Sequence, residues 1–113
     1  MLLSKKVLVA ESNDIVLALA TFLLQRQGFM VESSTTAEEA QRLLLEKTYD
    51  AILLDAAMVD IVHKSPHIAG RVVLMSSGDG DGNGDLQVNA TLRKPLEFSQ
   101  LIDTVKACAD QDA

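Results

Sequence analysis

The sequence has few of the residues that mark secreted or membrane-embedded proteins. It contains one cysteine, two prolines and no tryptophan, and aromatic residues make up 4% of its 113 residues. A single cysteine cannot form an intramolecular disulfide, which favours a reducing compartment and therefore a cytoplasmic location. The longest apolar run, residues 15–24, is about half the length that crosses a bilayer. The first residues, MLLSKK, place apolar residues before the lysines, whereas a signal peptide begins with its positive charges.

Basic residues are scarce relative to acidic ones. Ten Lys and Arg stand against 16 Asp and Glu, so the formal net charge is −6. Nucleic acids and anionic membranes are bound through clustered cations, and neither is an expected partner. Aliphatic residues are abundant, because 48% of the chain is hydrophobic. We therefore expect one domain, residues 1–113, whose aliphatic core lies between helices and a sheet.

Short β-rich runs alternate with helical segments along the chain. Strands are expected at 7–10, 29–32, 51–54, 72–75 and 91–93. Helices are expected over 14–27, from a capping box at 36–39 to about Lys47, and over 98–109. Asn13 or Ser12 can cap the first helix, and Gly28 can end it. This alternation predicts an α/β fold with one doubly wound, parallel five-stranded sheet in the order 2-1-3-4-5, which is flavodoxin-like.

Two connections are expected to depart from this regular pattern. Pro66 limits a third helix to one or two turns around residues 58–65. Residues 77–90, SGDGDGNGDLQVNA, contain four glycines at alternating positions. Each glycine costs a helix about 1 kcal/mol relative to alanine. The third helix is therefore predicted to be short, and the fourth to be missing or vestigial.

Polar residues end the predicted strands. In an open doubly wound sheet, ligands bind outside the carboxyl ends of the strands, where the strand order reverses. Glu11 and Asp55 lie at those ends, Ser76 ends the fourth strand and Lys94 follows the fifth. Two carboxylates favour a hard cation such as Mg²⁺, and a lysine and a hydroxyl facing them can bind a phosphoryl oxygen. The pattern indicates phosphoryl transfer onto Asp55, and an ordinary strand-end aspartate is the alternative.

Four segments carry a resemblance to a known family. KVLVAESN, YDAILLDAAM, VVLMSS and LRKPL resemble, in content and order, the receiver domains of two-component response regulators; they span residues 6–13, 49–58, 72–77 and 92–96. The resemblance implies that Asp55 is the phosphoacceptor, that Lys94 pairs with the phosphoryl group and that Ser76 is the switch hydroxyl.

The same resemblance implies a metal site and a backbone feature. Mg²⁺ would be held by Glu11, Asp55 and the backbone carbonyl of Ala57. The peptide bond between Lys94 and Pro95 would be cis. Both expectations come from the family and not from the spacing of these residues.

Three positions depart from the family pattern. Ser12 stands where a second acidic residue normally binds Mg²⁺, so metal binding should be weaker. Val59 replaces the proline that usually follows the matched Met58, and Thr91 occupies the position of an aromatic switch residue. The chain therefore looks like an atypical, degenerate receiver.

The leading prediction is a stand-alone receiver, a phosphoprotein of a phosphorelay signal transduction pathway that signals by protein contact. It would not be an enzyme beyond promoting its own phosphorylation and dephosphorylation. Its partners would be a histidine kinase or histidine phosphotransferase and an unknown downstream protein. The alternative is a pseudo-receiver, a binding module that acts without phosphorylation.

Other features have a functional and an ordinary interpretation. Residues 79–90 match the opening of a calcium loop, but Ala90 stands where a bidentate glutamate should close it, so a polar loop is favoured. His63 and His67 are four residues apart, but Pro66 separates them and exposed loop histidines are expected. Cys108 lies on the apolar stripe of the last helix and should be a buried, inert thiol.

The first helix is more apolar than one buried face requires. Between Ile15 and Leu24 only Thr21 is polar. Either part of this surface is exposed and serves a partner or self-association, or the helix is more deeply buried than usual. Replacing Leu17 or Leu24 by lysine is expected to separate the two: loss of folding would indicate burial.

Overall fold

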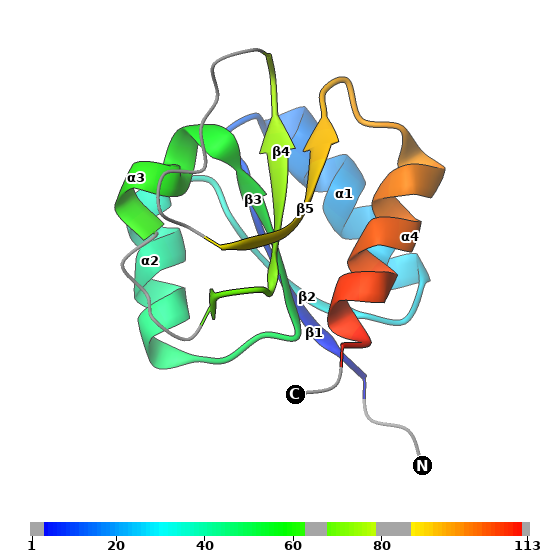
Figure 1. Ribbon diagram of the computed structural model, residues 1–113, viewed down its shortest axis with the longest axis horizontal. Coiled ribbons are helices and arrows are strands. Elements are labelled where there is room, and N and C mark those ends of the chain that lie inside the picture. The colour runs from blue at the N-terminus through cyan, green and yellow to red at the C-terminus, as the bar shows by residue number, and fades with distance from the viewer. Residues whose placement is uncertain (1–3, 63–67, 79–86, 112–113) are drawn as a thin grey trace.

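The chain folds around the predicted parallel sheet, with strands in the order β2-β1-β3-β4-β5 (Figure 1). This computed structural model describes residues 4–62, 68–78 and 87–111. The strands are β1 (Lys6–Ala10), β2 (Met30–Ser34), β3 (Ala51–Asp55), β4 (Val72–Ser76) and β5 (Val88–Arg93). The helices are α1 (Asp14–Arg26), α2 (Ala37–Glu46), the 3₁₀ helix η1 (Ala56–Met58), α3 (Val59–Val62) and α4 (Phe98–Ala109).

Helices cover both faces of the sheet. Figure 1 shows α1 and α4 on one face and α2 and α3 on the other. Side chains alternate between the two faces along each strand, so Val7 and Val9 pack with α1 and α4, whereas Leu8 packs with α2. The central strands β1, β3 and β4 are thus buried on both sides, which explains their continuous apolar runs.

The predicted helix boundaries are set by local hydrogen bonds. The Asn13 side chain caps α1 by accepting from the backbone N–H groups of Ile15 and Val16 at 2.9 and 3.1 Å. Gly28 follows α1 with a φ of 95°, a left-handed conformation that favours glycine. The Thr36 hydroxyl accepts from the Glu39 N–H at 3.2 Å and begins α2. Asn13 is therefore the first cap, and Ser12 is not.

All five strands differ from their predicted bounds, and β2 and β5 differ most. Strand β2 begins at Met30 and not at Phe29, because the Phe29 N–H still donates to the Leu24 carbonyl at the end of α1, at 3.2 Å. Strand β5 begins at Val88, three residues before the predicted start, and a register shift between Val72 and Val73 accompanies its pairing with β4.

Within the described residues the third helix is short, as predicted: α3 spans Val59–Val62, and residues 63–67 lie outside the described ranges. In the glycine-rich connection the described residues, 77, 78 and 87, form no helix, and residues 79–86 lie outside the described ranges. The predictions for His63, Pro66 and His67, and for residues 79–86 of the calcium-like segment, concern residues outside the described part of the chain. Residues 88–90 of that segment belong to β5, so the predicted polar loop is wrong for them. No helix within that part is long and apolar enough to cross a membrane.

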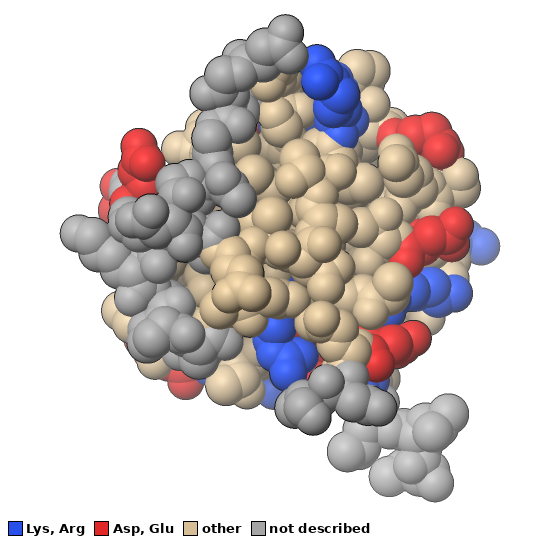
Figure 2. Space-filling view, viewed as in Figure 1, with Lys and Arg blue, Asp and Glu red and all other residues tan. Residues whose placement is uncertain are grey.

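Figure 2 shows uncharged residues over much of the surface near β5 and α4, with charged side chains mainly toward its margins.

Cys108 is buried as predicted, and its Sγ donates to the Arg71 carbonyl at 3.3 Å. Burial raises the pKa of this thiol above its usual range. The thiol form is therefore favoured, as expected for an inert cysteine.

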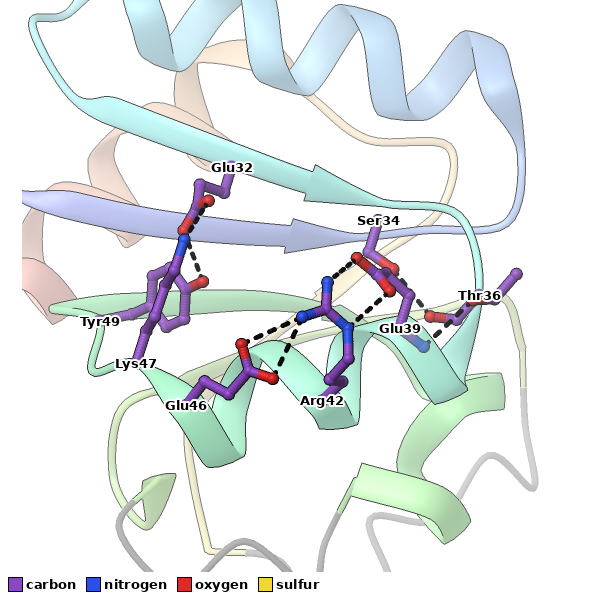
Figure 3. A network of polar contacts seen from close by, with 8 residues as sticks. All are labelled: Glu32, Ser34, Thr36, Glu39, Arg42, Glu46, Lys47 and Tyr49. Carbon is purple, nitrogen blue, oxygen red and sulfur yellow. Dashed lines mark hydrogen bonds and ion pairs between the residues drawn. The ribbon is translucent and has the colours of Figure 1, made fainter.

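A polar network joins β2 to α2 and to the segment before β3 (Figure 3). The Tyr49 hydroxyl donates to Glu32 Oε1 at 2.7 Å, and Lys47 Nζ lies 2.8 Å from Glu32 Oε2. These hydrogen bonds hold the pKa of the Glu32 carboxyl below its usual range. On α2, Arg42 pairs with Glu39 and Glu46 across successive turns.

Candidate functional site at the carboxyl ends of the strands

Asp55 ends β3, and its carboxylate has partners at the strand mouth. The backbone N–H of Ala57 donates to Oδ1 at 3.1 Å, because Asp55 caps the 3₁₀ helix η1. The hydroxyl of Ser12 donates to Oδ2 at 3.4 Å. Asp55 is 7% exposed. A buried carboxylate needs such donors, so this position is compatible with a charged side chain at the end of an apolar strand.

Glu11 follows β1 and is almost completely buried. Its backbone N–H donates to the Ser34 carbonyl at 3.0 Å, and its Oε2 accepts from the Asn13 N–H at 3.0 Å. Its Oε1 lies 2.7 Å from Lys94 Nζ, and no other described residue gives it a partner with hydrogen-bond geometry. The ammonium group is thus the main compensation for charge at this buried oxygen.

Lys94 connects the two acidic residues. Its Nζ lies 3.6 Å from Asp55 Oδ1, in addition to the shorter contact with Glu11. Its backbone N–H donates to the Ser76 carbonyl at 2.8 Å, which fixes the loop after β5 to the end of β4. The peptide bond between Lys94 and Pro95 is cis, as the resemblance implies.

Ser76 is buried at the end of β4, beside the end of β3. In the sheet register Met75 pairs with Asp55, so Ser76 lies one residue beyond that pair. Its hydroxyl donates to the Gly78 carbonyl at 3.1 Å. The structure therefore places Ser76 at the predicted edge of the sheet.

The structure brings the predicted residues to one edge of the sheet, and Ser12 makes a contribution there that was not predicted from the sequence. Ser12 was interpreted as a possible helix cap and as a lost acidic ligand, whereas its hydroxyl contacts Asp55 directly. The signal available was its position next to Glu11 at the end of the first strand. The other two atypical positions lie in regular elements: Val59 begins α3 and is buried, and Thr91 is exposed on β5.

The oxygen donors of this site fit Mg²⁺ in kind but are few. Glu11 and Asp55 supply carboxylates, and the buried Glu11 Oε1 atom lies beside the Lys94 ammonium. Oxygen ligands of this type suit a hard cation. Among the residues that the structure describes, however, there is no cluster of three or more acidic, histidine or cysteine side chains that could hold a metal ion. Ser12 contributes a hydroxyl, and not a carboxylate, beside Asp55.

No protein-family model matches this sequence, and no curated protein matches it either. Solved structures are nevertheless similar in fold. A CheY-like response regulator receiver domain protein from Methanospirillum hungatei JF-1 superposes with a TM-score of 0.81 at 18% identity, covering 96% of this chain and 95% of that chain. A response regulator receiver domain protein from Clostridium thermocellum gives 0.76 at 22% identity, with 96% and 95% covered.

A third similar structure is the receiver domain of the hybrid histidine kinase CckA. Its TM-score is 0.73 at 23% identity, and the match covers 93% of this chain and 99% of that one. These likenesses, together with the strand order 2-1-3-4-5, show that the chain has the flavodoxin-like fold of response regulator receiver domains.

Proposed function

We propose that this chain is a response regulator receiver that accepts a phosphoryl group on Asp55. The observation that carries the proposal is the position of this carboxylate. It lies at the carboxyl end of the central strand β3, with Lys94 Nζ 3.6 Å away and with donors from Ser12 and Ala57. Ligands of open doubly wound sheets bind at this edge.

In the proposed reaction an Asp55 oxygen attacks the phosphorus atom of a phosphohistidine on a histidine kinase or histidine phosphotransferase. A phosphorus–oxygen bond forms, the phosphorus–nitrogen bond breaks, and the leaving imidazole nitrogen takes up a proton from water. Lys94 stabilises the phosphoryl oxygens electrostatically, and the Ser76 hydroxyl serves as a further donor at the adjacent strand end.

Glu11, Asp55 and the backbone carbonyl of Ala57 are the residues that would hold Mg²⁺. When bound, the cation would neutralise charge on the phosphoryl oxygens. Because Ser12 contributes a hydroxyl in place of a carboxylate, we expect weak binding. The protein would act in the cytoplasm as a phosphoacceptor, not as an enzyme with a separate substrate, and it would signal to an unknown downstream protein.

The proposal is tested by incubating the chain with acetyl phosphate and Mg²⁺ and measuring its intact mass. We expect a gain of one phosphoryl group that disappears in Asp55→Asn and after chelation. Asp50→Asn is the matched control, since Asp50 immediately precedes the same strand at its opposite end. Failure of Asp55→Asn to abolish the gain would show that another residue is modified.

The second candidate is a pseudo-receiver that binds a partner without phosphorylation. Two observations favour it: Lys94 Nζ lies closer to Glu11 than to Asp55, and the described acidic residues form no three-ligand cluster. This function predicts no mass gain in the folded protein, either with acetyl phosphate or with a phosphorylated histidine phosphotransferase. It also predicts that Asp55→Asn leaves partner binding unchanged.

A further inference from the structure

Helix α1 exposes a second apolar face. Ile15, Leu19 and Phe22 are 73%, 43% and 54% exposed, and their spacing of four and three residues places them on one side of the helix. Ala20 and Leu24 are buried against the sheet on the other side. The interpretation that α1 is simply more deeply buried is therefore wrong. Leu24→Lys would disrupt the core and would not test the exposed face.

The exposed face continues into a hollow between α1 and α4. The hollow has a volume of about 220 Å³, and its lining includes Val16 and Leu23 of α1 and Leu96 and Phe98 near the start of α4. Phe98 is itself 48% exposed. Protruding apolar side chains and an apolar hollow therefore lie on the same surface, which we call the α1–α4 face. A surface that carries both features can be complementary to itself.

Charged residues lie at both ends of the α1–α4 face. Acidic residues stand where the helices begin, with Asp14 in the first turn of α1 and Glu97 as the cap of α4. Basic residues stand in the last turns, with Arg26 on α1 and Lys106 on α4. Both helices follow parallel strands, so they begin at the same end of the molecule (Figure 1).

These charges also suit the dipoles of their own helices, which gives them a role within a single chain. Two observations extend the pattern beyond the helices. The guanidinium of Arg26 lies 5.7 Å from the centre of the Phe22 ring, at the margin of the apolar surface. Lys5 joins Lys106 in lining a hollow at the basic end, where Asp110 is the acidic member. The α1–α4 face is therefore polarised from end to end.

We propose that the α1–α4 face binds a second copy of this chain, with the two α1 helices antiparallel. A two-fold axis perpendicular to α1 places the same patch on both copies and reverses its direction. Asp14 and Glu97 of each copy then face Arg26 and Lys106 of the other, while the apolar residues meet between them. A uniformly acidic or uniformly basic partner would be repelled at one end of this face.

The expected association is weak. Each copy contributes two helices of 13 and 12 residues, and helices of that length are about 20 Å long. Such a face is at the small end of the range for stable interfaces. The net charge of −6 on each copy also opposes association at low ionic strength. We therefore expect a dimer with a dissociation constant in the micromolar range at about physiological salt.

The test is sedimentation velocity of the full chain over a range of concentrations, with Asp14→Lys and Arg26→Glu as a pair of variants. Each variant alone places like charges at both symmetric contacts, so each should dissociate at least tenfold more readily than wild type. An equimolar mixture places opposite charges at both contacts, so the mixture should form dimers again. Neither residue belongs to the candidate phosphoryl site.

Ile15→Lys tests the apolar part of the face, and Leu45→Lys is its matched control. Leu45 is 62% exposed on α2, which covers the opposite face of the sheet. We expect Ile15→Lys to be monomeric and Leu45→Lys to dimerise like wild type, with circular dichroism showing that both are folded.

Three results would overturn the proposal: a wild-type chain that stays monomeric at several hundred micromolar, an Ile15→Lys variant that dimerises normally, or a variant mixture no more associated than its components. Each result is independent of whether Asp55 is phosphorylated.

Discussion

Lys94 and Glu11 form a 2.7 Å ion pair in which the glutamate side chain is 1% exposed and the lysine side chain 20%. The lysine comes from the loop after β5, on the outermost strand, whereas the glutamate follows the inner strand β1. The pair therefore joins segments that are distant in sequence, and it compensates a carboxylate that water barely reaches. Removal of the lysine would leave this carboxylate buried without its cationic partner.

We expect Lys94→Met to lower the free energy of unfolding by about 3 kcal/mol, because breaking a buried pair strands an uncompensated charge. Urea denaturation measures the change. Arg42→Met is the control: its pairs with Glu39 and Glu46 are about half exposed and screened by solvent, so its loss should be much smaller. Adding Glu11→Gln to Lys94→Met should recover part of the loss. Equal losses in the two single variants would contradict this account.

A second prediction concerns the turn between α1 and β2. A Cβ atom at Gly28 would meet nothing within 4 Å, so the cost of Gly28→Ala should come from its φ of 95° alone. We expect a loss of about 1 kcal/mol in unfolding free energy. Gly78 has equally open surroundings and no left-handed φ, so Gly78→Ala should be neutral or slightly stabilising. A similar loss at both glycines would mean that the backbone conformation is not the cause.

The sequence was sufficient to predict features that depend on local patterns and on parallel topology. The span of α4 was predicted to the residue because Leu101, Val105 and Cys108 repeat at helical spacing. Glu11, Asp55 and Lys94 could be assigned to one site because the carboxyl ends of parallel strands share one edge of the sheet. Phosphorylation at that site remains a prediction.

Features that depend on partners distant in sequence were not predicted. The first half of β5 has a weak strand pattern, and its pairing with β4 was not apparent from the residues of β5 alone. The hydrogen bond from Ser12 to Asp55 depends on how the loop after β1 turns toward the end of β3. The sequence places these residues 43 positions apart, and no local rule joins them.

A third prediction concerns the ionisation of Tyr49, which is the one tyrosine in a chain without tryptophan. Burial, followed by its hydrogen bond to Glu32, raises the pKa of Tyr49 well above the usual range. Because the pKa is raised in the folded state, the contribution of Tyr49 to stability is fully present below the unfolded tyrosine pKa of about 10. That contribution is lost as the pH rises through the folded-state pKa. Near-ultraviolet titration should therefore show phenolate only at more alkaline pH than in the unfolded chain.

Glu32→Gln should lower the Tyr49 pKa relative to wild type, because it removes both the charge and the charged acceptor. Glu38→Gln, an exposed substitution on α2, is the control and should leave the titration unchanged. If the folded and unfolded chains titrated at the same pH, the contact drawn between Tyr49 and Glu32 would not persist in solution.

The last prediction concerns Ser12, which controls the charge of the candidate metal site. The two carboxylates of Glu11 and Asp55 already share the Lys94 ammonium, so a divalent cation meets little net negative charge. Ser12→Asp would add a third carboxylate next to Asp55, and we expect at least tenfold tighter Mg²⁺ binding, equivalent to about 1.4 kcal/mol. Isothermal titration calorimetry measures the affinity.

Without metal the variant should be less stable than wild type, because three carboxylates then repel one another. Thr48→Asp adds the same charge on the exposed segment before β3 and should change neither quantity. If Ser12→Asp left Mg²⁺ affinity unchanged, the cation would not bind between the ends of β1 and β3, and phosphorylation of Asp55 would have to rely on Lys94 for charge compensation.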